Sequence, residues 1–406
     1  MSDNQPSLSR ITPDDDPMQV FEEMRAVSQD LYWDEDSGAW CAIGHETVRT
    51  ILNDHEKFGS QHLNTSAEPV LGARVLAQIT GSEHDHKKAA ALKSISHVAM
   101  DSYYLPAVEE TARRLWADQK EKRSFDFVES ISEPFSIEVT CRLIGLDPRQ
   151  SRRFLPWNRS VVAFITTLHR DPKDSAHQLR DAALFRAFIR RLITARTRKP
   201  HDDLLSYLAV EGQQAGFSTD EIVALIINIF LAASEPLGKT LAYCTFEILR
   251  SPEITAKVSA DSDVLPAIIA ESLRLHSPVQ IIPRIVNDNV EVAGRELRPG
   301  DLVFCLVGAA NRDPRVFTDP DRFSLNRPEL VVKSAFSPSS RHNSFGSGLH
   351  FCIGAMLAKR QLHAGLCASL PYLHRWRLTD ERFPERGLYT RGPVRLDLTL
   401  RDSEVR

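Results

Sequence analysis

The chain is poor in cysteine, and its cysteines are not paired along the sequence. There are six among 406 residues, and no two stand in a Cys-x-x-Cys spacing. This scarcity argues against a zinc knuckle and against a disulfide framework. Most of these cysteines are therefore expected to be buried, small apolar side chains. They are Cys41, Cys141, Cys244, Cys305, Cys352 and Cys367.

A surplus of one charge and a long apolar run are also missing. The formal net charge is -4, with both signs interleaved along the chain, so we expect no nucleic-acid partner. No stretch reaches the roughly 18 apolar residues that a membrane span needs. The first twenty residues, MSDNQPSLSRITPDDDPMQV, lack the charged-then-apolar pattern of a signal peptide. We therefore expect a cytoplasmic protein without a membrane anchor.

What is present is the composition of a large helical protein. Hydrophobic residues make up 42% of the chain and charged residues 26%. No Gly/Ser-rich or Pro-rich linker interrupts it, so residues 1–406 are expected to form a single domain. Apolar residues recur at helical spacing in many segments, and short alternating segments occur toward both ends. The helical segments include residues 21–31, 45–55, 107–119, 184–198 and 203–212, and the strand-like ones are 38–44, 289–297 and 394–400.

One segment, residues 221–250, is apolar on nearly every face of a helix until its charged end. A helix of this kind is typical of the buried centre of a protein. Glu235, Pro236 and Lys239 interrupt the apolar run. We therefore expect this helix inside the protein rather than in a membrane.

Cys352 has unusual neighbours, because it follows a glycine-rich stretch and precedes a predicted helix in the sequence FGSGLHFCIG, residues 345–354. Free amide groups and the dipole at a helix N-terminus stabilise a thiolate. Gly346, Gly348 and Gly354 would give the backbone freedom for close approach of a flat, bulky ligand. The ordinary alternative is a buried cysteine beside a glycine turn.

The complete spacing, Phe345-x-x-Gly-x-His350-x-Cys352-x-Gly354, resembles the haem-binding signature of the cytochrome P-450 family. The resemblance implies haem b with Cys352 as its iron ligand, and a thiolate ligand favours O–O cleavage. It also implies the fold of that family. That fold is mainly α with small β-sheets, a triangular helical prism with haem between a long central helix and the cysteine-bearing helix.

A second match to the family is the Glu-x-x-Arg pair formed by Glu271 and Arg274. Residues at this spacing share a helix face and can pair, as many surface residues do. The resemblance adds Arg327, from the segment DPRVFTDPDRFSLNRPE, as the third member of this network.

The family also suggests which residues hold the haem propionates, which need cations when buried. Arg284 and His350 match two such positions. In the segment TGSEHDHKKAAALKS, His84 matches a third, although the alignment can slip to His86. Lys88 stands where arginine is usual, which replaces a bidentate fork by a point charge.

The central helix departs from the family pattern. The family usually has Ala-Gly-x-Asp/Glu-Thr-Thr, and this chain has AASEPL, beginning at Ala232. Pro236 replaces the alcohol that helps to deliver protons, and its missing N–H should make the helix kink or open there. Thr240 lies one turn further on and Ser234 nearly opposite, so neither fits well. Glu235 is either the proton-handling group or a structural buried acid.

The substrate pocket is expected to be lined by mostly aliphatic segments, which would suit a small to medium-sized apolar organic substrate. These segments are residues 64–80, Phe230–Ala233, Val279–Ile282 and Leu388–Tyr389. A lid is expected between Leu168 and Gln178, where a polar stretch separates two helical segments.

The resemblance thus implies a haem-thiolate monooxygenase. It would activate O2 with two electrons from ferredoxin and ferredoxin reductase, and hydroxylate or O-dealkylate its substrate. A peroxide-driven or non-oxygenating enzyme is the alternative suggested by Pro236, and a haem-binding sensor is a third possibility. We expect a monomer that receives an acidic ferredoxin on basic residues such as Lys87, Lys359 and Arg360.

Overall fold

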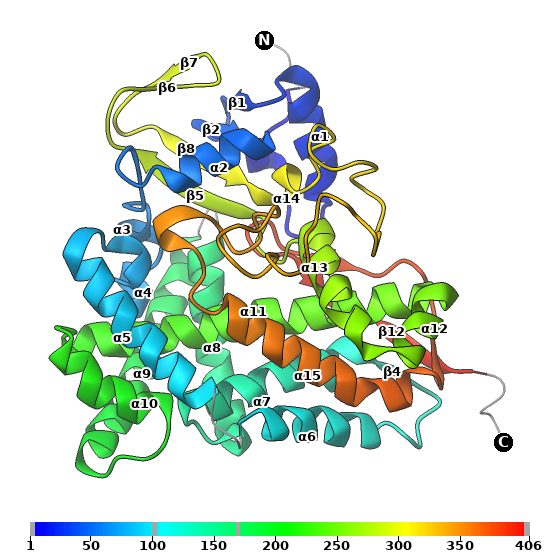
Figure 1. The fold of residues 1–406 in the computed structure, drawn as a ribbon. Coiled ribbons are helices and arrows are strands. Elements are labelled where there is room, and N and C mark those ends of the chain that lie inside the picture. Colours follow the sequence, from blue (N-terminus) through cyan, green and yellow to red (C-terminus); the bar gives the residue numbers. More distant parts are fainter. Residues whose placement is uncertain (1–4, 100–103, 168–170, 402–406) are drawn as a thin grey trace. The chain divides into compact units, whose positions relative to one another are not determined.

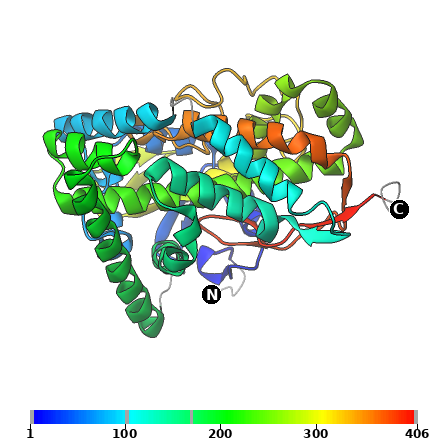
Figure 2. The ribbon, with the colours of Figure 1, turned by 90° about the horizontal axis from the view of Figure 1, so that it is seen from below.

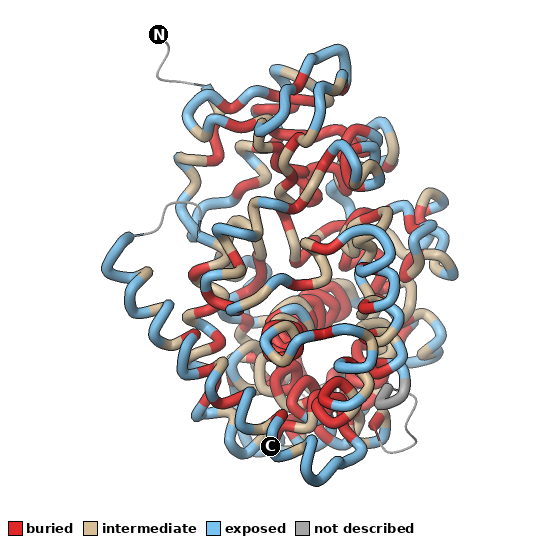
Figure 3. The backbone as a smooth tube through the Cα atoms, turned by 90° about the vertical axis from the view of Figure 1, so that its left-hand side faces the viewer, coloured by how far each residue is buried: buried red, intermediate tan, exposed pale blue. Residues whose placement is uncertain are grey.

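The computed structural model describes residues 5–99, 104–167 and 171–401. They fall into two compact units. The first comprises Met1–Ser60, Trp116–Ser132 and Lys239–Arg406, and the second comprises Gln61–Leu115 and Glu133–Gly238. Buried stretches gather in the interior, and exposed stretches lie on peripheral helices and loops (Figure 3).

The first unit contains the strands. Its main sheet has the order β1-β2-β8-β5-β3, with β2 and β8 parallel and the other neighbours antiparallel. Apolar residues of this sheet pack on α2 (His45–Asn53), which buries Val48, Ile51 and Leu52. The strands are β1 (Leu31–Asp34), β2 (Ala39–Ala42), β8 (Leu302–Leu306), β5 (Ile281–Val286) and β3 (Phe58–Gly59).

Three smaller sheets complete the β-structure that the structure describes. Figure 2 shows β4 beside the C-terminal strand β12, and β12 also pairs with β9. The other two sheets are hairpins. The strands are β4 (Ser124–Asp126), β9 (Trp376–Leu378), β12 (Asp397–Leu400), β6 (Val290–Val292), β7 (Arg295–Leu297), β10 (Glu385–Arg386) and β11 (Gly392–Pro393).

In the first unit α13 packs beside α15 (Figure 1). The α-helices are α1 (Pro17–Val27), α2, α12 (Pro252–Ala260), α13 (Leu265–His276), α14 (Val307–Ala310) and α15 (Ala355–Leu373). Shorter helical turns include η1 (Leu8–Arg10), η3 (Val128–Ser132), η6 (Ser262–Val264) and η7 (Gly348–His350).

The second unit is helical in its described residues. Its centre includes stacked aromatic rings. The centre of the Phe154 ring lies 6.2 Å from that of Phe185 and 5.9 Å from that of Phe188. The Phe230 ring packs edge-on against the Phe154 ring. The elements are α3 (Leu63–Ser66), α4 (Glu68–Leu71), η2 (Leu76–Gln78), α5 (Gly81–Ala99), α6 (Tyr104–Ala117), α7 (Glu133–Ile144), η4 (Pro148–Gln150), α8 (Ser151–Thr166), α9 (Pro172–Arg198), α10 (Leu204–Tyr207) and η5 (Leu208–Gly212).

The expected lid is only partly described. Its segment Leu168–Arg170 lies outside the described residues. From Pro172 onward the chain already belongs to α9, because Asp171 caps the helix and Pro172 occupies a first-turn position where its missing N–H costs nothing. The expectation of a loop up to Gln178 was therefore wrong.

The long apolar helix is α11 (Thr219–Arg250), and the boundary between the two units falls within it. It is long and apolar enough to cross a membrane, but 67% of its most apolar 18-residue window is buried in the protein. We expected a kink or an opening at Pro236. α11 stays helical through this residue, so the expectation of an opening was wrong. A proline inside a helix costs about 3 kcal/mol. Burial of flanking side chains such as Leu237 and Leu241 offsets this cost.

Candidate active site

The cysteine turn belongs to the first unit. Cys352 lies two residues before Gly354, the N-cap residue of α15, and its backbone N–H donates to the Phe345 carbonyl at 2.9 Å. Cys352 is exposed, whereas four cysteines are buried as expected and Cys367 is half-buried. The turn therefore presents one accessible thiol in front of a helix.

Two glycines make this turn possible. Gly346 and Gly348 have φ values of 70° and 66°, in the left-handed region that favours glycine. A Cβ on Gly348 would come within 2.8 Å of the Asn53 Cα, at the end of α2. The turn thus lies directly against α2, where the Ser347 hydroxyl also donates to Asn53 Oδ1 at 2.7 Å. Gly354 has a φ of −91°, so its own conformation does not require glycine.

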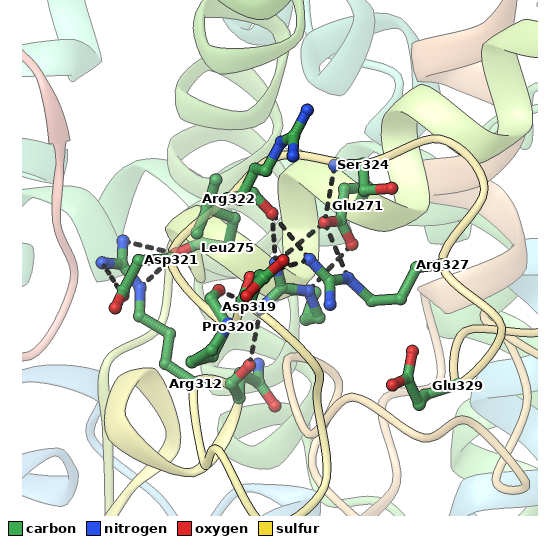
Figure 4. A network of polar contacts seen from close by, with 12 residues as sticks. Glu271, Leu275, Arg312, Asp319, Pro320, Asp321, Arg322, Ser324, Arg327 and Glu329 are labelled. Carbon is green, nitrogen blue, oxygen red and sulfur yellow. Dashed lines mark hydrogen bonds and ion pairs between the residues drawn. The ribbon is translucent and has the colours of Figure 1, made fainter.

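The expected Glu271, Arg274 and Arg327 network is confirmed. Figure 4 shows Glu271 and Arg327 within it. Arg274 donates to both Glu271 oxygens at 2.8 Å, and Arg327 Nε donates to Glu271 Oε1 at 3.0 Å. The Ser324 backbone N–H adds a bond at 3.0 Å to the same oxygen. These side chains are buried, and their pairing and hydrogen bonds offset the cost of burying the charges.

Arg284 on β5 is buried in a different way. Its Nη1 donates to the Pro283 carbonyl at 2.8 Å, and among the described residues no carboxylate pairs with it. Burial lowers the pKa of its guanidinium below the ordinary value. A buried cation without an anion is costly, so this position is suited to an anionic group of a ligand.

The α5 candidates lie in the second unit. His84 is buried, with its Nδ1 3.2 Å from Asp85 Oδ1, whereas His86 is exposed. Lys88 is half-buried and lies one turn after His84 on the same face of the helix. This arrangement favours His84 over His86 as the partner of Lys88.

Lys87 does not lie on a docking surface, so that expectation was wrong. Its side chain is 4% exposed, and its Nζ lies 2.8 Å from Glu83 Oε1 and 2.7 Å from Glu221 Oε1. The ammonium also lies 5.1 Å from the centre of the Phe217 ring. The HDHKK sequence concealed this burial because its partners at residues 217 and 221 are distant along the chain.

The central helix combines exposed small residues with polar ones. Ala232 is exposed on α11, and Glu235 and Pro236 are half-buried. The Ser234 hydroxyl donates to the Phe230 carbonyl of its own helix at 2.6 Å. Its proton is therefore used within the helix and does not point to a ligand. Thr240 is buried, in the part of α11 that belongs to the first unit.

Two of the expected pocket segments lie side by side in the first unit. The Gln280 N–H donates to the Tyr389 carbonyl at 2.8 Å, and Val279 bridges Thr390. Tyr389 lies between β10 and β11, which form a hairpin. The buried Tyr243 hydroxyl donates a hydrogen bond to Glu385 of β10. Sequence reasoning missed this anchor, because a tyrosine on an apolar helix looks like ordinary packing.

Gln280, in the expected segment Val279–Ile282, uses its side-chain amide to bond the end of a helix. Its side chain is buried, and its Nε2 donates to the carbonyls of His276 at 2.8 Å and Ser277 at 2.6 Å. The amide thus closes the end of α13. The alternating pattern of a strand-like segment turns neighbouring side chains to opposite sides, which the aliphatic composition alone did not reveal.

Comparisons with known proteins agree with these features. The family model "Cytochrome P450" matches residues 149–382. Pulcherriminic acid synthase of Bacillus subtilis (strain 168) is 36% identical over 94% of each chain. The chain belongs to the cytochrome P450 family. It is a cytochrome P450 monooxygenase, and its cofactor is haem b.

Other cytochromes P450 extend the comparison. The 6-deoxyerythronolide B hydroxylase of Saccharopolyspora erythraea is 31% identical, over 72% of this chain and 70% of that protein. A solved cytochrome P450 in complex with a hexadec-9Z-enoic acid-ligated acyl carrier protein has a TM-score of 0.83 at 23% identity, over 95% of this chain and 98% of that one. The structural likeness confirms the expected cytochrome P450 fold.

The residues of the first unit fit haem b. A cytochrome P450 haem needs a thiolate and cations for its two carboxylates. The accessible thiol of Cys352 and the buried, carboxylate-free guanidinium of Arg284 have the chemistry of these two partners. Phe345, Gly346 and His350 flank the same thiol along the turn.

Proposed function

We propose that Cys352 is the iron ligand of this cytochrome P450 and that Arg284 and His350 bind haem propionates. The observation that carries this proposal is that the first unit contains both an exposed thiol, at Cys352, and a buried guanidinium, at Arg284, without a carboxylate partner among the described residues. His84 and Lys88 are proposed as further propionate ligands. Phe345, Gly346 and Gly354 are proposed to contact the cofactor beside the thiol.

The reaction is proposed to be hydroxylation or O-dealkylation of a small to medium-sized apolar substrate. When bound, haem b supplies the oxygen chemistry, in which O2, two electrons and two protons yield one oxygen atom inserted at a C–H bond and one water. O-dealkylation follows where that C–H bond adjoins an ether oxygen. Support comes from relatives that are named as a hydroxylase and as a steroid C26-monooxygenase.

Protons for this reaction are proposed to pass through Glu235. In an α-helix the N–H of residue 236 would donate to the Ala232 carbonyl, but proline has no N–H. The Ala232 carbonyl therefore lacks this donor and can accept a hydrogen bond from a water molecule. Ala232 is exposed and Glu235 is half-buried, so both can reach solvent. Ser234 is bonded to its own helix, which leaves Glu235 as the acid in this stretch.

Electrons are proposed to come from a ferredoxin and its reductase. The protein that receives them is proposed to be a monomer in the cytoplasm. Lys359 and Arg360, on the first turns of α15, follow the cysteine turn and are half-buried. Lys359 lies over the Phe336 ring, with its Nζ 5.2 Å from the ring centre. Neutralising both residues should slow reduction by ferredoxin, and an unchanged reduction rate would contradict their role.

Turnover with defined electron sources tests the activity. The protein is incubated with ferredoxin, ferredoxin reductase and NADPH, or with hydrogen peroxide alone, and substrates are chosen by their shift of the haem spin state. Because one relative is named pulcherriminic acid synthase, pulcherriminic acid is the first product to assay. Oxygenated product that requires the reductase supports the proposal, and absence of any oxygenated product contradicts it.

A peroxide-driven reaction is the second candidate, and Pro236 favours it. Without an alcohol at this position, proton delivery after oxygen binding depends on a single acid. Peroxide already carries the protons and electrons that this pathway would supply. Turnover with peroxide but not with ferredoxin, reductase and NADPH would select this candidate over the first.

A further inference from the structure

The side chain of Asn311 lies at the centre of a group of buried hydrogen bonds in the first unit. It follows α14 as its C-cap residue and is 0% exposed. Its Nδ2 donates to Ser277 Oγ at 2.8 Å and to Ser344 Oγ at 2.9 Å. Its Oδ1 accepts the backbone N–H of Asn343 at 2.7 Å. One amide therefore uses both of its donors and its acceptor to join separate segments of the chain.

Two of the hydrogen-bond partners of Asn311, Asn343 and Ser344, belong to the segment that carries the cysteine. Asn343 and Ser344 immediately precede Phe345, whose carbonyl accepts the Cys352 N–H at 2.9 Å. The Asn343 carbonyl accepts the Gly346 N–H at 2.8 Å, which starts the glycine turn. The two residues bonded to Asn311 thus hold the beginning of the turn that carries Cys352.

The third partner, Ser277, is the C-cap residue of α13. Ser277 has a φ of 37°, in the left-handed region where a non-glycine residue is strained. Its hydroxyl donates to the carbonyls of Leu273 at 3.2 Å and Arg274 at 3.1 Å. Arg274 Nη1 in turn donates to the Asn311 carbonyl at 2.9 Å. Asn311 is therefore fixed to the same buried network as Glu271.

We propose that Asn311 is a positioning residue that holds the cysteine segment against the end of α13 and so keeps the Cys352 thiolate in place for haem iron. This inference rests on the proposed ligation by Cys352. The site needs one acceptor and two donors in a buried space, which an asparagine amide supplies. Aspartate keeps the acceptor and loses both donors, whereas alanine loses all three.

The test compares Asn311→Ala and Asn311→Asp with the wild-type holoenzyme. Hydrogen exchange of the Asn343 amide should be slow in wild type and in Asn311→Asp, which keeps the acceptor, and about tenfold or more faster in Asn311→Ala. In the reduced carbon monoxide complex, the band of thiolate ligation should decay fastest in Asn311→Ala and at an intermediate rate in Asn311→Asp. Outer residues that orient metal ligands have effects of this kind.

A matched control is Asp34→Ala, which removes a buried acceptor of the Leu8 N–H on the far N-terminal segment. It should lower the melting temperature without faster loss of the thiolate band. If Asn311→Ala folds and behaves like wild type in both measurements, the inference is overturned. If it does not fold, wild-type decay of the thiolate band in Asn311→Asp overturns it. A wild-type protein without the thiolate band would instead overturn the proposed Cys352 ligation itself.

Discussion

At the scale of single residues, the arginines of the first unit separate structural from cofactor roles. Arg274 is buried with Glu271 and several carbonyls around it. Arg284 is buried with one backbone carbonyl, and no carboxylate among the described residues. The energetics of the two charges therefore differ, because Arg274 has a carboxylate partner among the described residues and Arg284 has none there.

Replacing each arginine by leucine should give opposite results in the haem-free protein. Arg284→Leu should leave the free energy of unfolding of the apoprotein unchanged or raised, since an uncompensated buried charge is removed, and should speed haem dissociation by about tenfold or more. Arg274→Leu should destabilise the apoprotein by about 3 kcal/mol or more. Denaturant unfolding and haem transfer to an acceptor protein measure the two effects. Equal destabilisation of the apoprotein by both variants would contradict the role of Arg284.

Glu235 allows a test of proton delivery. Glu235→Gln keeps the shape of the side chain and removes its acidity, so the turnover number should fall about tenfold or more while the dissociation constant of the substrate changes little. Steady-state turnover and the substrate-induced spin-state shift measure these quantities separately. Equal losses in both would indicate a structural acid. Ser234→Ala is the control, and we expect it to keep turnover because Ser234 is bonded to the Phe230 carbonyl.

Cys352 could be proposed from sequence because its motif has a fixed spacing, and Glu271, Arg274 and Arg327 because a separate Glu-x-x-Arg pair and a later segment resemble the family. Burial was harder to predict. Lys87 looked like a surface residue, and its partner Glu221 is more than a hundred residues away along the chain. The roles of Asn311 and Gln280 depend on contacts between segments that carry no recognisable pattern of their own.

At the scale of elements, α5 carries two lysines whose environments differ. Lys87 is buried between Glu83 and Glu221, whereas Lys93 is 72% exposed and pairs with Glu211. Lys87→Ala should lower the free energy of unfolding by about 1–3 kcal/mol, because Glu221 then keeps only the longer ion pair with Arg74 at 3.7 Å. Lys93→Ala should change it by less than about 1 kcal/mol. Denaturant unfolding of both holoproteins measures this, and equal changes would contradict the burial of Lys87.

The first turn of α2 depends on a carboxylate, and this gives a pH prediction. Burial opposes ionisation of Asp313, but hydrogen bonds from Arg315 and from the His45 N–H outweigh it and lower its pKa to about 2. A carboxylate with a lowered pKa in the folded state adds stability above its unfolded pKa of about 4, and this contribution is lost as the pH falls toward 2. Asp313→Asn should remove up to about 2 kcal/mol at neutral pH.

The measurement for Asp313 is denaturant unfolding between pH 6 and pH 2. The difference in unfolding free energy between wild type and Asp313→Asn should be constant above about pH 4 and should shrink below it. A difference that stays constant down to pH 2 would show that Asp313 does not titrate as this geometry requires.

Several helices and strands were predictable from periodicity, because α2, α6, much of α9 and the terminal strand β12 have regular apolar spacing. The continuity of α11 was not. The local rule that proline breaks a helix was outweighed by packing on both sides of Pro236, which only tertiary structure reveals. The start of α9 was missed for a related reason, since a polar sequence concealed the Asp171 cap and the proline after it.

At the scale of the whole molecule, the function follows from a short motif supported by residues spread along the chain. The cysteine turn, the Glu271 network and Arg284 lie in the first unit, although Glu271 and Cys352 are about 80 residues apart along the chain. The family and the cofactor could be predicted because the chemistry of a haem thiolate constrains sequence closely. The substrate could not, since aliphatic segments of this kind suit many apolar molecules.

The most direct test of the account is the absorption spectrum of the reduced, purified protein with carbon monoxide, recorded for wild type and for Cys352→Ala. We expect wild type to show the Soret band characteristic of thiolate-bound haem, and Cys352→Ala to lose it. Cys367→Ala, which removes the half-buried thiol of α15, should keep the band. A wild-type band typical of histidine ligation, or a thiolate band that survives in Cys352→Ala, would contradict the central claim that Cys352 binds haem iron.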